Sequence, residues 1–280
     1  SRYKGTEYTS PEPKPQLMLA TILAVATALL YLVSTGLQLT QITQRREHIA
    51  GTVLSLGLIA LTGHAVLACQ SVAVAGTANL GFYKMPVLLF LVINTACIAS
   101  LIRRPLQNLL VILFPLSAIA VLVATFAPAT TEVNPDIPGG VFVHIASSIL
   151  AYSLLTLAAF QAALVAIQDH QLKRHHTRGI VQALPPLQLM ESMLFELLWV
   201  GVILLTVSIG SGALFLEDIF AQHLAHKTVL SIFAWILFAV LLWGHHRLGW
   251  RAQTAVRFTL AGFCLLMLAY FGSKLVLELV

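Results

Sequence analysis

Charged side chains are scarce in this sequence. Only 10% of its 280 residues are Asp, Glu, Lys or Arg, and 58% are apolar. An average soluble domain carries roughly 25% charged residues, so too little polar surface is present here to cover a water-soluble globule. The formal net charge of +5 does not indicate a nucleic-acid partner, because the basic residues gather between apolar runs, which in a membrane protein is a topology signal.

Cysteine motifs and short metal-binding motifs are also missing. Cys69, Cys97 and Cys264 stand alone inside apolar runs, and no CxxC, CxxCH or HExxH spacing occurs. A zinc site, a dithiol redox pair and covalent attachment of haem are therefore unsupported. The three cysteines are interpreted as buried structural thiols.

What the sequence does contain is a series of apolar runs, each close to the roughly 20 residues that a helix needs to cross a bilayer. Short polar segments separate these runs. The predicted fold is therefore all-α: a polytopic integral membrane bundle of about eight transmembrane helices, with both termini outside. The spans are expected at residues 17–38, 50–72, 86–102, 106–126, 140–168, 193–215, 229–246 and 255–277.

The distribution of basic residues predicts the orientation of the bundle. They fall in every second connection, which the positive-inside rule assigns to the cytoplasm. The alternate connections near 127–139 and 216–228 contain acidic residues and few basic ones, so they are expected outside. An even number of spans then places both termini outside too. The basic residues are Arg45, Arg46, Arg103, Arg104, Lys173, Arg174, Arg178, Arg247, Arg251 and Arg257.

The chain is expected to contain one domain. Residues 1–16 are polar and rich in proline, without the arrangement of a signal peptide, and are interpreted as a disordered tail or a cloning remnant. Residues 17–280 then form a single transmembrane helical domain. No half-helix pair and no charged midplane cluster is evident, so a substrate transporter is a weaker interpretation.

Ten histidines is a high number for so apolar a chain, and ionisable residues inside a membrane are costly enough to indicate function. His64 lies about 14 residues into the second span, or roughly 21 Å from its cytoplasmic end, in the outer half of the membrane. His144 begins the fifth span just below the outer surface. His223 and His226 lie in the last outer connection. Four histidines are thus predicted to converge on the outer leaflet.

The other histidines lie on the cytoplasmic side, where His245 closes the seventh span. Most of this group accompany lysine and arginine, so a solvated basic surface is the simpler interpretation of them. For His64 and His144 two interpretations stay open: a ligand of a bound group, or a histidine satisfied by a neighbouring helix. The remaining cytoplasmic histidines are His48, His170, His175, His176 and His246.

Imidazole binds haem iron, zinc and copper, but zinc sites usually add cysteine or carboxylate ligands in close motifs that this chain lacks. Haem needs only one or two axial side chains and an apolar cleft between helices. The residues therefore favour non-covalently bound haem b as the cofactor. Aromatic side chains near the outer face are candidates for its cleft, although aromatics at membrane interfaces also occur as belts with no ligand. The aromatic candidates are Phe82, Tyr83, Phe142, Tyr152, Phe215, Phe220, Phe233 and Trp235.

The second half of the chain contains three segments that point to a known family. They read GGVFVHIASSILAYSLLTLAAFQAALVAI, LLWVGVILLTVSIGSGALF and KTVLSIFAWILFAVLLWGHHRLGWRAQTAVRFTLAGFCLLMLAYFGSKLV. Together they resemble the CcsA-like cytochrome c assembly proteins, and most closely the smaller bacterial branch called YpjD. The earlier spans agree in hydropathy and at GHAVLA. The resemblance implies a multi-pass protein of the bacterial inner membrane.

The resemblance also implies roles for two histidines. In members that handle haem, a histidine that opens an HVxxxxxAY-type span is an external axial ligand, and His144, followed by Tyr152, resembles it. A histidine near the inner end of the span before a basic GW segment belongs to a transmembrane haem site, and His245 lies close to that position.

The chain departs from the family at its outer haem motif. The Trp-rich WGxxWxWD motif is replaced by AQHLAHK, where only Lys227 of a following KETW-like stretch is kept. The family's second external histidine is missing as well. His144 therefore needs another partner, and the candidates on that side are His64, His223 and His226.

These observations predict a non-enzymatic protein related to cytochrome c biogenesis, which coordinates haem between two histidines and delivers it. His64 and His144 are the predicted external pair, with His226 as the alternate ligand and His245 as part of an inner site. The predicted partners are haem and membrane lipids, and not nucleic acid. The alternative is a partner or regulator of another integral membrane protein, such as an ion transporter, that keeps this scaffold without haem.

Overall fold

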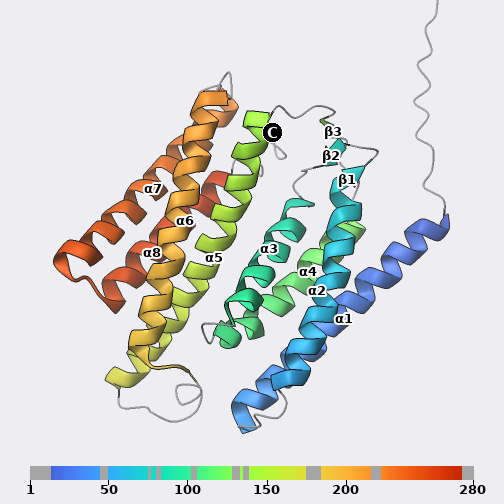
Figure 1. Ribbon diagram of the computed structural model, residues 1–280, viewed down its shortest axis with the longest axis horizontal. Coiled ribbons are helices and arrows are strands. Elements are labelled where there is room, and N and C mark those ends of the chain that lie inside the picture. The colour runs from blue at the N-terminus through green and yellow to red at the C-terminus, as the bar shows by residue number, and fades with distance from the viewer. Residues whose placement is uncertain are drawn as a thin grey trace, which may run out of the picture.

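The computed structural model describes residues 14–44, 50–74, 77–79, 83–101, 106–127, 133–134, 139–174, 184–215 and 222–272. These residues form eight α-helices that pack as a bundle (Figure 1). A short 3-10 helix, η2 (Leu106–Leu109), precedes α4, and a π-helical turn, η4 (Leu268–Gly272), follows α8. The α-helices are α1 (Lys14–Gln44), α2 (Ala50–Val72), α3 (Met85–Ser100), α4 (Leu110–Phe126), α5 (Gly139–Lys173), α6 (Leu187–Phe215), α7 (Gln222–Leu248) and α8 (Ala252–Met267).

Seven stretches of helix in the described part of the chain are long and apolar enough to cross a membrane. The remaining helix, α3, has 16 residues. At about 1.5 Å per residue it covers about 24 Å, slightly less than a hydrocarbon core of about 30 Å. The prediction of an all-α membrane bundle of about eight helices is confirmed.

Two helix boundaries differ from the prediction. The sequence predicts an outer connection at 216–228, but α7 already begins at Gln222. Hydropathy marks only the part of a helix that lies in hydrocarbon, whereas Gln, Ala, Leu and Lys in the preceding segment are good helix formers and extend it. At the other end of the chain, α1 begins at Lys14, so the last residues of the predicted tail 1–16 are helical. Residues 1–13 lie outside the described residues.

A small antiparallel sheet joins two connections at one end of the bundle. Strands β1 (Ala73–Val74) and β2 (Thr77–Asn79) follow α2, and β3 (Val133–Asn134) lies between α4 and α5. Strand β2 pairs with both β1 and β3. The two connections therefore lie on the same side of the bundle (Figure 1), as the alternation of charge along the sequence requires.

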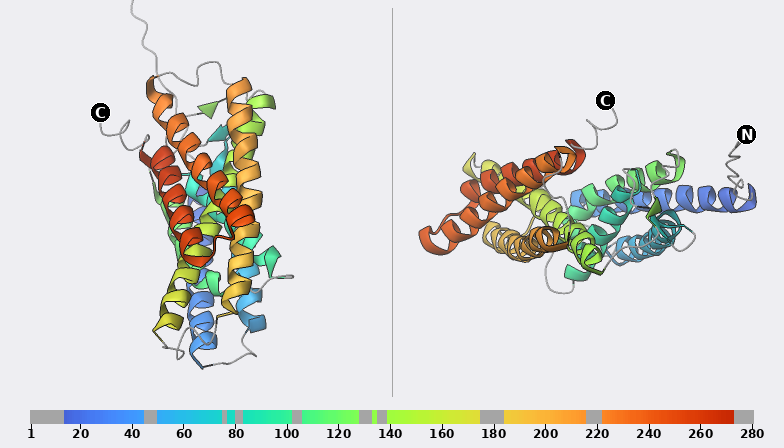
Figure 2. Two further views of the ribbon diagram at one scale, coloured as in Figure 1. Left: turned by 90° about the vertical axis from the view of Figure 1, so that its left-hand side faces the viewer. Right: turned by 90° about the horizontal axis from the view of Figure 1, so that it is seen from above.

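The helices form two halves that meet where α3 packs against α5. Helices α1 to α4 share a core that includes Tyr31 and Phe114, and α5 to α8 share another that includes Leu155 and Phe238. Figure 2 shows the two halves side by side from above. The most extensive helix contact is between α5 and α6, where Gly201 leaves space for the side chain of Leu155. This pair of helices carries the site described below.

The cysteines are not all buried. Cys97 on α3 is buried, as predicted, but Cys69 on α2 and Cys264 on α8 are exposed. All three are free thiols. The interpretation as buried thiols is wrong for the two exposed ones, because an apolar sequence does not distinguish a helix face turned to the core from one turned to lipid.

Candidate ligand-binding site

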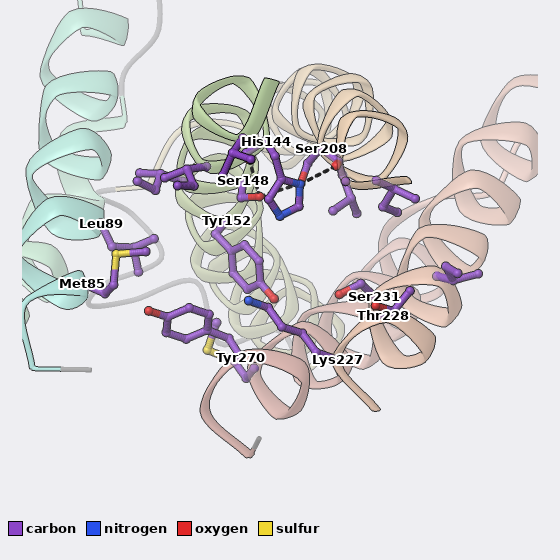
Figure 3. A pocket seen from close by; sticks show the side chains of 18 of the residues that line it. Met85, Leu89, His144, Ser148, Tyr152, Ser208, Lys227, Thr228, Ser231 and Tyr270 are labelled. Atoms are coloured by element: carbon purple, nitrogen blue, oxygen red, sulfur yellow. Dashed lines mark hydrogen bonds between the residues drawn. The ribbon is translucent and has the colours of Figure 1, made fainter. Parts of the chain in front are cut away.

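The C-terminal half contains a cavity of about 450 Å³, within the range of about 300–1,000 Å³ that is usual for ligand sites. Helices α5, α6 and α7 form most of its wall, and the start of α3, the last residue of α8 and the turn η4 complete it (Figure 3). The lining is mostly apolar. Its polar and ionisable side chains are His144, Ser148, Tyr152, Ser208, Lys227, Thr228, Ser231 and Tyr270.

His144 is fixed at the edge of this cavity by a hydrogen bond. Its Nδ1 lies 2.8 Å from the carbonyl oxygen of Ser208 on α6. Because a carbonyl can only accept, Nδ1 carries the proton, and in the neutral ring Nε2 keeps its lone pair. Figure 3 shows this second nitrogen turned away from Ser208 and toward the cavity. A hydrogen bond of this kind is what orients a histidine ligand and makes it more basic toward a metal.

Small residues on α6 make room for the imidazole. A Cβ atom added at Gly212 would lie 3.0 Å from Nδ1 of His144, so only glycine leaves the ring in its present place. One turn earlier, the hydroxyl of Ser208 lies 2.6 Å from that of Ser148 on α5. This part of α6 therefore positions His144.

Lys227 and Tyr270 face the cavity from the side opposite α6, and Tyr152 reaches toward them from α5 (Figure 3). The ammonium group of Lys227 lies 5.4 Å from the ring centre of Tyr270, within the range of a cation–π interaction. The ring of Tyr270 meets that of Tyr152 edge to face at 5.8 Å. The hydroxyl of Tyr152 donates to the carbonyl of Leu266 at 3.1 Å. Sequence reasoning missed Tyr270, although a lysine at the predicted outer end of the seventh span and a tyrosine toward that of the eighth are a usable signal.

His64 lies elsewhere, buried between α1, α2 and α3. Its Nε2 is 2.9 Å from the carbonyl oxygen of Val87, and its Nδ1 is 3.1 Å from the hydroxyl of Tyr31. The carbonyl requires a proton on Nε2, so in the neutral ring Nδ1 accepts from the tyrosine, and both ring nitrogens are engaged within the protein. The predicted common cleft for His64 and His144 is therefore not formed.

The physical reason is the position of α3 between the two histidines. Its first residues Met85, Pro86 and Leu89 line the cavity, whereas the intervening Val87 is fully buried and bonds to His64. The sequence pattern does not show that a helix lies between the two histidines.

Two more histidines were predicted as candidate ligands, and the structure describes the side chain of one of them, His226. His226 is an exposed residue of α7 and is not part of the lining, although Lys227 and Thr228 beside it are. His223 lies in the first turn of α7, and its side chain is outside the described residues.

His245 lies at the opposite end of α7. Its Nδ1 is 2.8 Å from the carbonyl oxygen of Trp250, and its ring stacks on Phe195 with 3.5 Å between centroids. Gly244 allows the ring of Trp250 to fold back on α7. The structure thus places His245 in the last turn of α7, against the tight connection to α8 and well separated along α7 from Lys227 and the cavity.

The expected aromatic cleft is mostly wrong. Phe82 and Phe220 are not among the described residues. Of the other six candidates, Tyr152 alone lines the cavity. Phe142, Phe215 and Phe233 are exposed on helix faces that a membrane would cover. Where the structure describes the chain, no cluster of three or more His, Cys, Asp or Glu side chains is placed to hold a bare metal ion.

The family described as Cytochrome C assembly protein matches residues 22–280. The chain belongs to this family. It is 32% identical over 261 residues to inner membrane protein YpjD of Escherichia coli K12, which covers 92% of the chain and 99% of that protein. It is also 34% identical over 173 residues, 61% of the chain and 63% of that protein, to an uncharacterized 28.8 kDa protein in the nifR3-like 5' region of Azospirillum brasilense. No solved structure is significantly similar to it.

Membership of the cytochrome c assembly family confirms the resemblance seen in the sequence. The match extends over both halves of the bundle and includes the segments that form the cavity. Together with the membrane-length helices, the relationship to a protein named for the inner membrane makes the chain a multi-pass inner-membrane protein.

Proposed function

We propose that this member of the cytochrome c assembly family binds haem b in the cavity, with Nε2 of His144 as an axial ligand. The observation that carries the proposal is the orientation of His144. Its Nδ1–H is engaged by Ser208, and the nitrogen that can bind iron faces a mostly apolar space. Non-covalent binding of haem needs this combination of an oriented imidazole and an apolar cleft.

The residues of the cavity fit such a ligand in three respects. The volume of about 450 Å³ falls within the range of about 300–1,000 Å³ for sites that hold ligands. Apolar side chains of α3, α5 and α6 form walls suited to the flat faces of a porphyrin, and Lys227 adds a positive charge. Haem bound here would supply an iron centre held by non-covalent ligation.

The geometry supports ligation by one histidine in place of the predicted bis-histidine pair. Both ring nitrogens of His64 already have partners in the protein, so recruiting it as a ligand would break two buried hydrogen bonds. Among the described residues of the lining, His144 alone provides an imidazole. The role of the protein is then to bind and pass on haem, with no covalent step on its own side chains.

Hemin titration of the purified protein in mild detergent tests this proposal. The wild type is expected to give a Soret band, and His144→Ala to lose or shift it. Added imidazole is expected to restore the band in His144→Gly, because the freed space then holds an external ligand. His246→Ala, at the exposed inner end of α7, is the matched control and is expected to behave as the wild type.

A wild-type protein that binds no hemin contradicts the proposal. That outcome favours the alternative function, a partner or regulator of another integral membrane protein that keeps the family scaffold without haem. If hemin binds but only His245→Ala changes its spectrum, the haem site lies at the inner end of α7 and not in the cavity.

A further inference from the structure

We infer that Lys227 binds a carboxylate group of the ligand in the cavity, and that the site is therefore selective for an amphipathic molecule with an acidic edge. This inference rests on the proposed function and specifies which part of the haem the site recognises. Lys227 comes from α7 and His144 from α5, so the two side chains approach the same cavity from different helices (Figure 3).

The charge of the cavity is the first argument. Lys227 lines it, and within the described part of the chain no Asp or Glu belongs to the lining. The other polar groups there are hydroxyls and the imidazole of His144. A cation among apolar walls is costly in a membrane protein and therefore indicates a functional role. Such a lining is electrostatically complementary to a ligand that carries a negative charge.

The position of the ammonium group is the second argument. Lys227 is half-buried, and its ammonium lies 5.4 Å from the ring centre of Tyr270, which holds it at the side of the cavity. Tyr270 is in turn packed against Tyr152. The tyrosines thus restrict a long, flexible side chain, so less conformational freedom is lost when it binds an anion.

The third argument is that one molecule can satisfy both groups. Nε2 of His144 offers a lone pair for a metal, and Lys227 offers N–H donors for a carboxylate. Apolar residues lie between them on the walls. Haem combines an iron centre, an apolar ring and two carboxylates, so its acidic edge is expected to lie on the side of Tyr270 and Lys227.

Hemin and hemin dimethyl ester, in which both carboxylates are blocked, distinguish this role from a structural one. Lys227→Gln is expected to weaken hemin binding at least about tenfold, the usual strength of a charge-assisted hydrogen bond. The same variant is expected to bind the ester with wild-type affinity. Lys227→Arg keeps the charge and is expected to retain most of the hemin affinity.

Lys173→Gln is the matched control, because Lys173 pairs with Asp169 at the inner end of α5. Its affinity for both compounds is expected to equal that of the wild type. The inference is wrong, and the proposed function stands, if Lys227→Gln binds hemin with wild-type affinity. The same conclusion holds if this variant loses affinity for hemin and for the ester equally while His144 still acts as the ligand. If the wild type binds neither compound, the proposed function is wrong and the inference with it.

Discussion

Replacing Gly212 by alanine is expected to weaken haem binding without weakening the fold. The added Cβ atom would lie 3.0 Å from Nδ1 and 3.1 Å from Cε1 of His144, whereas comfortable contacts are about 3.5–4.0 Å. The imidazole must therefore move by about half an ångström. The hydrogen bond from Nδ1 to the carbonyl of Ser208, now 2.8 Å long, would be stretched beyond the useful range of about 3.2 Å.

The expected magnitude follows from these two effects. Loss of a neutral hydrogen bond costs about 0.5–1.5 kcal/mol, which corresponds to a fall in hemin affinity of about twofold to tenfold. Alanine is favoured over glycine in a helix by about 1 kcal/mol. This gain offsets the lost hydrogen bond in the free energy of unfolding, so thermal stability is expected to stay close to that of the wild type while the affinity falls.

Gly210→Ala provides a matched control on the same helix, because a Cβ atom at Gly210 would meet no atom within 4 Å. It receives the same gain in helix propensity and leaves His144 in place. Hemin titration and thermal unfolding in detergent should be compared for the wild type and both variants. Equal hemin affinity for Gly212→Ala and Gly210→Ala would refute the reasoning that the orientation of His144 supports ligand binding.

Two further predictions follow from the same structure. His64→Phe leaves the carbonyl of Val87 and the hydroxyl of Tyr31 without their present partner, at a cost of about 1–3 kcal/mol for each buried group. Its melting temperature should therefore fall while the folded fraction keeps wild-type hemin affinity. An unchanged melting temperature with a loss of hemin affinity would make His64 a ligand. Single cysteines introduced at positions 130 and 218, with the native cysteines replaced, should be labelled from outside the cell, and one at 178 only after the membrane is opened. Labelling of position 178 in intact cells would invert the predicted topology.

Much of the architecture could be predicted because it depends on properties that act along the chain. The length of each apolar run is sufficient to indicate a membrane-spanning helix, since every backbone group in lipid must be satisfied within its own helix. The basic residues between the runs predicted alternating connections, and the pairing of β2 with β3 agrees with them. His144 was found as a candidate because an ionisable side chain is unusual in such a segment.

The function of each histidine depended on contacts that these patterns do not contain. His64 and His144 have similar predicted depths, but His64 is held by Tyr31, 33 residues earlier in the chain, while His144 is held by Ser208, 64 residues later. In a helix of a soluble protein, the contrast between a polar and an apolar face shows which face is buried. Here the faces toward lipid and toward the core both select apolar residues. The sequence by itself therefore determined the number of helices, their order and the family. Only the tertiary structure decided how each helix is rotated about its axis, and with that which imidazole nitrogen faces the cavity.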